Sequence, residues 1–141
     1  MSVRSGVPGA CLLAVLLLVL PTAAAEEKEN PILTFVKSKV KDPDKPFTLL
    51  ITLKVKEGEE KKLEEVFAKA VKPTRKEKGC ITYDLSHDTS DAGRYVVYER
   101  WTSVEALKAH LETAHIKALL AALPELLAGA PEPRVLTPAA E

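Results

Sequence analysis

The sequence predicts an α+β domain in which helices pack against one face of an antiparallel sheet. Several segments alternate apolar and polar residues, as strands with one buried face do. Others repeat apolar residues every three to four positions, as amphipathic helices do. Along the chain these segments follow the order β-α-β-β-α-β, which is the split β-α-β plan known as ferredoxin-like. The expected domain spans residues 47–138.

The first strand and the first helix have the clearest patterns. In FTLLITLKV, residues 47–55, every second residue is apolar, and Gly58 marks the turn that follows. The helix carries its apolar stripe at Leu63, Val66, Phe67, Ala70 and Val71. Pro73 and the KEKG turn are expected to end it.

A hairpin of two strands comes next. CITYDLSH and RYVVYERW both alternate, and the polar segment DTSDAG joins them. One face of the second strand carries Tyr95, Val97, Glu99 and Trp101. If the strand phases agree, Tyr83, Glu99 and Trp101 project into the same space between sheet and helices.

The last helix is expected to be broken in two. Thr102 and Glu105 have the spacing of a capping box, and Thr113 can cap the second piece. Pro124 is expected to kink this piece or to begin a new turn, and Gly129 is expected to end it. The segment EPRVLT can then form a short last strand.

This plan leaves the second face of the sheet bare. Leu50 and Val96 are apolar residues on that face. A partly apolar face open to solvent predicts a homodimer with the two sheets face to face.

Residues 1–25 have the layout of a secretory signal peptide. One charge, Arg4, precedes an uncharged apolar run at residues 10–20, and small residues come before the acidic segment EEKEN. Cleavage after Ala25 would give an exported protein, periplasmic or extracellular, without stable membrane insertion; the alternative is an uncleaved anchor. Residues 26–46 are expected to form a charged N-terminal arm whose apolar centre can pair or dock elsewhere.

Charge and cysteine content exclude some classes of partner and bond. Without residues 1–25 the chain has 19 basic and 20 acidic residues, and no basic patch stands out, so a nucleic-acid partner is not expected. Cys80 is then the only cysteine, which excludes an intrachain disulfide and favours a buried apolar role for this side chain.

Two histidines, His110 and His115, lie close together in the last helical region. Five positions on one continuous helix place two side chains about 140° apart. They are therefore not expected to share a metal ion, and no carboxylate or cysteine cluster accompanies them in the sequence. His110 should point partly toward the sheet, and the helix dipole should keep His115 neutral, so either ring can serve as a base.

Purely structural roles are also open for these residues. Each histidine can simply hydrogen-bond in place, and Trp101 can pack in the core. Glu99 can pair with Arg94, Arg100 or a lysine; if it is buried without a partner, its pKa rises. His87, at a strand end, is expected at the surface.

The segments EKGCITYDL, RYVVYERWTSVEALKAHLETAHIKAL and PRVLTP closely resemble the antibiotic biosynthesis monooxygenase family, and within it the small quinol monooxygenases. The strand-to-helix junction Glu-x-Trp-x-Ser of that family matches Glu99, Trp101 and Ser103. The pattern Leu-x-x-His-x-x-Thr-x-His follows, here at Leu107, His110, Thr113 and His115.

This resemblance implies a dimeric α/β barrel made of two ferredoxin-like subunits, each with a pocket between helices and sheet. It further implies oxidation of a small quinol or phenol by O2 without metal, flavin or other cofactor, because a deprotonated ring in a dry pocket can react with O2 directly. His110 would be the base or the hydrogen-bond partner of the substrate. Tyr83, Glu99 and Trp101 would line the pocket, with His115 near its mouth.

Other activities are also compatible with the resemblance. Haem-degrading relatives carry Asn on the first strand and Trp in the helix, whereas Thr52 and His110 stand at the matching positions here. Isomerases of small hydroxylated ketones share the YxxYE strand and the histidine pattern. A third alternative is a dimer that binds a small aromatic molecule or haem without turnover.

Overall fold

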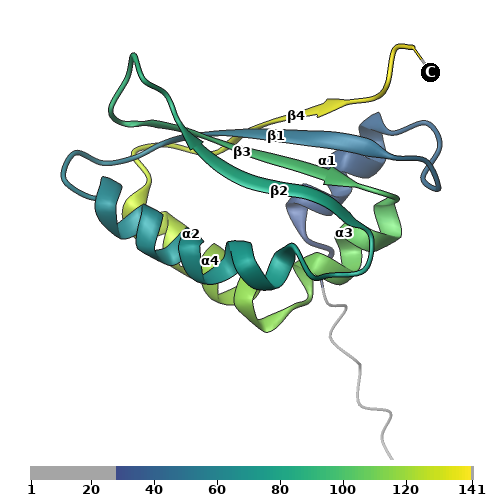
Figure 1. The fold of residues 1–141 in the computed structure, drawn as a ribbon, viewed down its shortest axis with the longest axis horizontal. Coiled ribbons are helices and arrows are strands. Elements are labelled where there is room, and N and C mark those ends of the chain that lie inside the picture. The colour runs from purple at the N-terminus through teal and green to yellow at the C-terminus, as the bar shows by residue number, and fades with distance from the viewer. Residues whose placement is uncertain (1–27, 141) are drawn as a thin grey trace, which may run out of the picture.

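The computed structural model describes residues 28–140 of the chain as a four-stranded antiparallel sheet with helices packed against it (Figure 1). The strands are β1 (Phe47–Lys54), β2 (Cys80–His87), β3 (Arg94–Trp101) and β4 (Glu132–Leu136), in the spatial order β2-β3-β1-β4. The helices are α1 (Pro31–Lys39), α2 (Glu60–Thr74), α3 (Val104–Leu111) and α4 (Ala114–Leu126). From β1 onward the order is the predicted β-α-β-β-α-β with a divided last helix, so the ferredoxin-like α+β prediction is confirmed.

The helices cover one face of the sheet, and the buried strand residues all lie on that face. Figure 1 shows α2 and α4 side by side beneath the strands, with α3 at the end where β3 finishes. Phe47, Leu49, Ile51 and Leu53 of β1 are buried, as are Tyr95, Val97, Glu99 and Trp101 of β3. On the opposite face, Leu50 pairs with Tyr98, whose side chain is 37% exposed. The predicted division into a packed face and an open face is therefore confirmed.

Some predicted helix ends were wrong. The N-cap of α3 is Ser103 rather than Thr102, and its hydroxyl accepts a hydrogen bond from the amide of Ala106. Helix α2 includes Pro73 in its last turn and ends at Thr74, shortly before the KEKG turn, so its predicted end is confirmed.

Helix α4 continues through Pro124. It ends at Leu126 because the backbone then turns extended at Leu127, which bridges to Val55. Gly129 therefore does not end this helix. Thr113 is the N-cap residue of α4 as predicted, although its hydroxyl makes no capping bond.

The N-terminal arm contains a helix that sequence patterning did not predict. The side chain of Asn30 caps α1 by accepting a hydrogen bond from the amide of Ile32, and a proline follows at the first helical position. Leu33 and Val36 are buried, and α1 packs against α3 and β4. The apolar centre of the arm thus docks on the domain. The signal peptide expected at residues 1–25 lies outside the described residues, and no helix among the described residues is long and apolar enough to cross a membrane.

Candidate functional site

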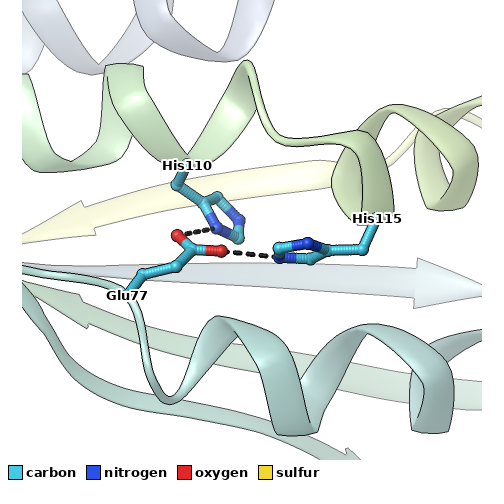
Figure 2. A group of neighbouring side chains, drawn as sticks. All are labelled: Glu77, His110 and His115. Atoms are coloured by element: carbon cyan, nitrogen blue, oxygen red, sulfur yellow. Dashed lines mark hydrogen bonds and ion pairs between the residues drawn. The ribbon is translucent and has the colours of Figure 1, made fainter.

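Three side chains from separate parts of the chain meet beneath the sheet (Figure 2). Glu77 comes from the turn between α2 and β2, His110 from α3 and His115 from the first turn of α4. One oxygen of Glu77, Oε2, lies 2.9 Å from Nδ1 of His110, and the other, Oε1, lies 2.6 Å from Nε2 of His115. The carboxylate therefore bridges the two imidazoles, and these three residues are called the Glu77 cluster below.

The break between α3 and α4 brings the two histidines together. The hydroxyl of Thr113 donates to the backbone carbonyl of His110 at 2.7 Å and lies 3.3 Å from Nε2 of His115. The chain changes direction here, so the two ring centroids are 6.4 Å apart. The expectation that the histidines point away from each other was wrong, because it assumed one continuous helix.

Glu77 is the site residue that sequence reasoning missed. The turn that carries Glu77 packs against the start of α3 at Gly79. This residue has a φ of 89°, and it has no side chain that would hold α3 away. A Cβ on Gly79 would lie 2.5 Å from Cβ of Ala106, and the carbonyl of Gly79 accepts a hydrogen bond from the amide of Thr102. This close approach carries Glu77 toward α3. The signal available in the sequence was a glycine two residues after a carboxylate, in a turn leading into a strand.

The hydrogen bonds of the cluster define the protonation of His110. A carboxylate only accepts hydrogen bonds, so Nδ1 of His110 carries a proton and donates a hydrogen bond to Glu77. In a neutral ring this leaves Nε2 as an acceptor. Within the described part of the chain no protein atom hydrogen-bonds Nε2, and His110 lines a cavity. Burial lowers the pKa of His110, and the Glu77 carboxylate partly opposes this shift. A neutral ring at physiological pH can therefore accept a proton from the cavity side.

Glu99 and its neighbours form a second group in the same space. Glu99 pairs with Tyr83 across β2 and β3, and its carboxylate accepts a hydrogen bond from Nε1 of Trp101 at 2.9 Å. Burial raises the pKa of Glu99 to about 7, although the Trp101 hydrogen bond acts in the opposite direction. Burial also raises the pKa of Tyr83 well above its ordinary value. Glu99 thus pairs with Trp101 and with none of the basic residues considered from the sequence.

The aromatic rings connect the two groups. The ring centroid of Trp101 lies 4.5 Å from that of His110, and Tyr83 lies 5.4 Å from His110. The sequence prediction that Tyr83, Glu99 and Trp101 project into one space with His110 agrees with this geometry.

Trp101, which the resemblance implied would line the pocket, is fully buried and is not one of the residues that line the cavity. The cavity has a volume of about 60 Å³ and lies between the sheet and the helices. Its polar wall is formed by Tyr83, Glu99 and His110, and the remainder is aliphatic or aromatic. His115 does not line it, because its ring is turned toward Glu77. Thr52 lies on the opposite face of the sheet from its neighbours Ile51 and Leu53, which do line the cavity. His87 is exposed, as predicted.

The Glu77 cluster is also the one group of described residues with three side chains that could ligate a metal ion. One ligand atom from each lies within 4.8 Å of the others. Ligand atoms around a tetrahedral ion with bonds of about 2.0 Å lie roughly 3.3 Å apart. The contacts of 2.6 and 2.9 Å are shorter, so these side chains form a hydrogen-bonded cluster as they stand. An ion would have to displace the ring protons that make these bonds.

Comparison with known proteins places this chain in a family. Residues 46–122 match the family model described as antibiotic biosynthesis monooxygenase. YcnE of Bacillus subtilis is 36% identical over 69 residues, which cover 47% of this chain and 73% of YcnE. The uncharacterised protein sll1783 of Synechocystis sp. is 28% identical over 89 residues, which cover 63% of this chain and only 60% of sll1783.

A solved structure shows the same fold. The structure of Rv0793 from Mycobacterium tuberculosis superimposes with a TM-score of 0.64 at 29% sequence identity. The match covers 68% of this chain and 97% of Rv0793. The shared fold thus accounts for almost the whole of that relative and leaves about a third of this chain outside it.

Proposed function

The chain belongs to the antibiotic biosynthesis monooxygenase family, and we propose that it oxidises a small quinol or phenol with O2 without a bound cofactor. The observation that carries this proposal is the hydrogen bonding of the His110 ring. Its Nδ1 is held by Glu77, its Nε2 has no protein hydrogen-bond partner among the described residues, and its ring lines a nearly apolar cavity. A phenolic hydroxyl placed there would give its proton to Nε2.

The remaining chemistry belongs to the substrate. A phenolate in an apolar cavity is electron-rich because no water solvates it, and it can pass one electron to O2. Recombination of the two radicals forms a carbon–oxygen bond, and cleavage of the O–O bond then releases water. For a hydroquinone, hydroquinone plus O2 gives hydroxyquinone plus water, so the ring supplies all the electrons and no external reductant is needed.

Other residues of the site support this step. The Glu77 carboxylate stabilises the imidazolium that forms when His110 accepts the proton, because Nδ1 already donates to it. Glu99, with a pKa raised to about 7, can be protonated near neutrality and can then donate to a developing oxyanion. Tyr83 offers a second hydroxyl on the same wall.

Oxygen consumption tests the proposal. Purified protein should consume O2 when supplied with small hydroquinones. In His110→Ala the rate should fall by a factor of about 10² to 10⁴, the usual contribution of a positioned base. His87→Ala is the matched control because His87 is exposed and does not line the cavity. Dialysis against a chelator should leave the rate unchanged. If no quinol offered causes O2 consumption, the oxygenase proposal is wrong.

A second candidate is an isomerase of a small hydroxy-ketone. The pairing of a neutral imidazole with a carboxyl of raised pKa on one cavity wall favours it, because such groups can move a proton from one carbon to the next. Turnover of a hydroxy-ketone under strictly anaerobic conditions would identify this activity, whereas the oxygenase stops without O2.

Assembly and export are further parts of the proposal. The open sheet face, with Tyr98 37% and Leu136 47% exposed, supports a homodimer formed through this face. Tyr98→Asp should then convert a dimer into a monomer in size-exclusion chromatography with light scattering. The pattern of residues 1–25 supports export, and mass spectrometry of the secreted protein should find a chain beginning at Glu26.

A further inference from the structure

We propose that α1 forms one side of the entrance to the cavity and, through Ile32, limits the ligand to a single aromatic ring. This inference rests on the proposed function to the extent that it takes the cavity as the ligand site. It concerns a part of this chain that the family match leaves out, since that match begins at residue 46 and α1 ends at Lys39.

Solvent exposure of the lining residues locates the entrance. Fourteen residues line the cavity, and most of them are buried. The three that retain exposure are Ile32 of α1, Leu120 of α4 and Pro131 just before β4. Because these three are the lining residues that are not buried, the entrance lies between α1, α4 and the segment that leads into β4.

Helix α1 is held firmly enough to act as a wall. Val36 is fully buried and Leu33 is 4% exposed, so the helix contributes two anchors to the core of the domain. Its first turn is fixed by the Asn30 cap, whose side-chain oxygen lies 2.9 Å from the amide of Ile32. Ile32 therefore projects from a capped and packed turn, and its side chain can change rotamer more readily than its backbone can move.

The volume of the cavity gives the limit on ligand size. At about 60 Å³ it is smaller than the roughly 150 Å³ cavity known to hold benzene in another protein. Rotation of half-buried side chains at the entrance, such as Ile32 and Leu120, can supply the difference for one ring. A fused second ring would require displacement of α1 itself, which would expose Leu33 and Val36 to water.

Binding measurements test this inference without relying on turnover. Trp101 is the only tryptophan of the chain and lies 4.5 Å from the His110 ring, so its fluorescence reports ligands at this wall. Wild-type protein should bind hydroquinone and phenol under anaerobic conditions and should bind 1-naphthol much more weakly. Ile32→Ala should improve the Kd for 1-naphthol by about tenfold or more and change that for hydroquinone little, since a few methylene groups in an apolar pocket discriminate by this factor. Ile32→Phe, which keeps Trp101 as the only tryptophan, should weaken both.

Phe35→Ala is the matched control, because Phe35 is also a half-buried apolar residue of α1 but does not line the cavity. It should leave the ratio of the two Kd values unchanged. Equal binding of one-ring and two-ring ligands by the wild type, or an unchanged ratio in Ile32→Ala, would overturn the role of α1 while leaving the oxygenase proposal intact. Binding with the expected ratios but without O2 uptake would overturn the oxygenase and retain α1. If no phenol binds any variant, both proposals fail.

Discussion

The carboxylate of Glu77 lies 2.9 Å from Nδ1 of His110, although 33 positions separate the two residues in the chain. The imidazole is 2% exposed and the carboxylate 15%, so this contact is shielded from most solvent competition. A hydrogen bond of this kind fixes the tautomer of the ring and its orientation. Glu77 is in this sense a positioning residue, acting on the substrate through His110.

Replacing Glu77 by Gln should test that role. The amide puts a donor toward one of the two imidazoles, so either His110 changes tautomer or the contact with His115 is lost. We expect kcat for quinol oxidation to fall about 10²-fold with little change in KM. Glu112→Gln is the control, because that carboxylate is exposed and forms an ion pair with Lys117 at the surface. An unchanged kcat in Glu77→Gln would show that its hydrogen bond does not serve catalysis.

The pH dependence of the rate should reveal the protonation of His110. The ring acts as a base only when neutral, so kcat/KM should rise with pH as the ring loses its proton. Burial lowers the pKa of His110 from its ordinary value of 6.5, and the acid limb should therefore have its midpoint below 6.5. Initial rates between pH 4.5 and 8 provide the measurement. A midpoint above 6.5 would mean that the Glu77 carboxylate outweighs burial.

Glu99 should make the protein less stable as the pH rises. Its pKa is about 7 in the folded state against an ordinary value of 4.5, so the folded chain holds a proton that the unfolded chain releases between these pH values. The stabilisation is full below pH 4.5 and is lost as pH rises through about 7. The shift corresponds to roughly 3 kcal/mol. Glu99→Gln retains an acceptor for Trp101 but has no group that titrates. The free energy of unfolding of this variant, relative to that of the wild type, should therefore increase from pH 5 to pH 8.

Urea unfolding of both proteins across this range measures the difference directly. Because His110 titrates in both proteins, its opposite pH dependence cancels in the comparison. A difference that stays constant with pH would show that Glu99 has an ordinary pKa in the folded state.

Gly79 should be the glycine least tolerant of a side chain. An alanine there combines a φ of 89° with a Cβ 2.5 Å from Ala106 and 2.7 Å from the Thr102 hydroxyl. We expect Gly79→Ala to lower the free energy of unfolding by about 3 kcal/mol, the sum of backbone strain and a steric clash. Gly58→Ala is a close control, since Gly58 has a φ of 87° with open space around it, and it should cost only about 1 kcal/mol. Equal losses in the two variants would remove the packing argument.

The sequence predicted the sheet and its buried face because alternation is a local signal. Glu99 and Trp101 lie two residues apart on one strand, so their shared face follows from the strand period alone. Tyr83 was predicted correctly for the same reason, once the hairpin had been recognised. Helix ends were predicted less well, since Ser103 and Thr102 are both good caps by composition and only the tertiary contacts of the turn decide between them.

The Glu77 cluster was not predicted because it depends on the tight approach at Gly79 and on the direction that α4 takes after the break. The break itself follows from the sequence, but the direction of the helix that follows it does not. Helical arithmetic applied across that break gave the wrong relation between His110 and His115. The sequence pattern also could not predict that α1 is a helix packed on the domain, because its short apolar centre is compatible with a strand or a helix.

The joint between α3 and α4 consists of Glu112 and Thr113 alone. Adding or removing one residue there would change the direction and the phase in which α4 begins, and would carry His115 away from the carboxylate. The number of residues in the joint is therefore as much a requirement of the cluster as the identities of its three members. In an alignment of related chains, a gap at this point should be read as loss of the cluster even where both histidines are retained.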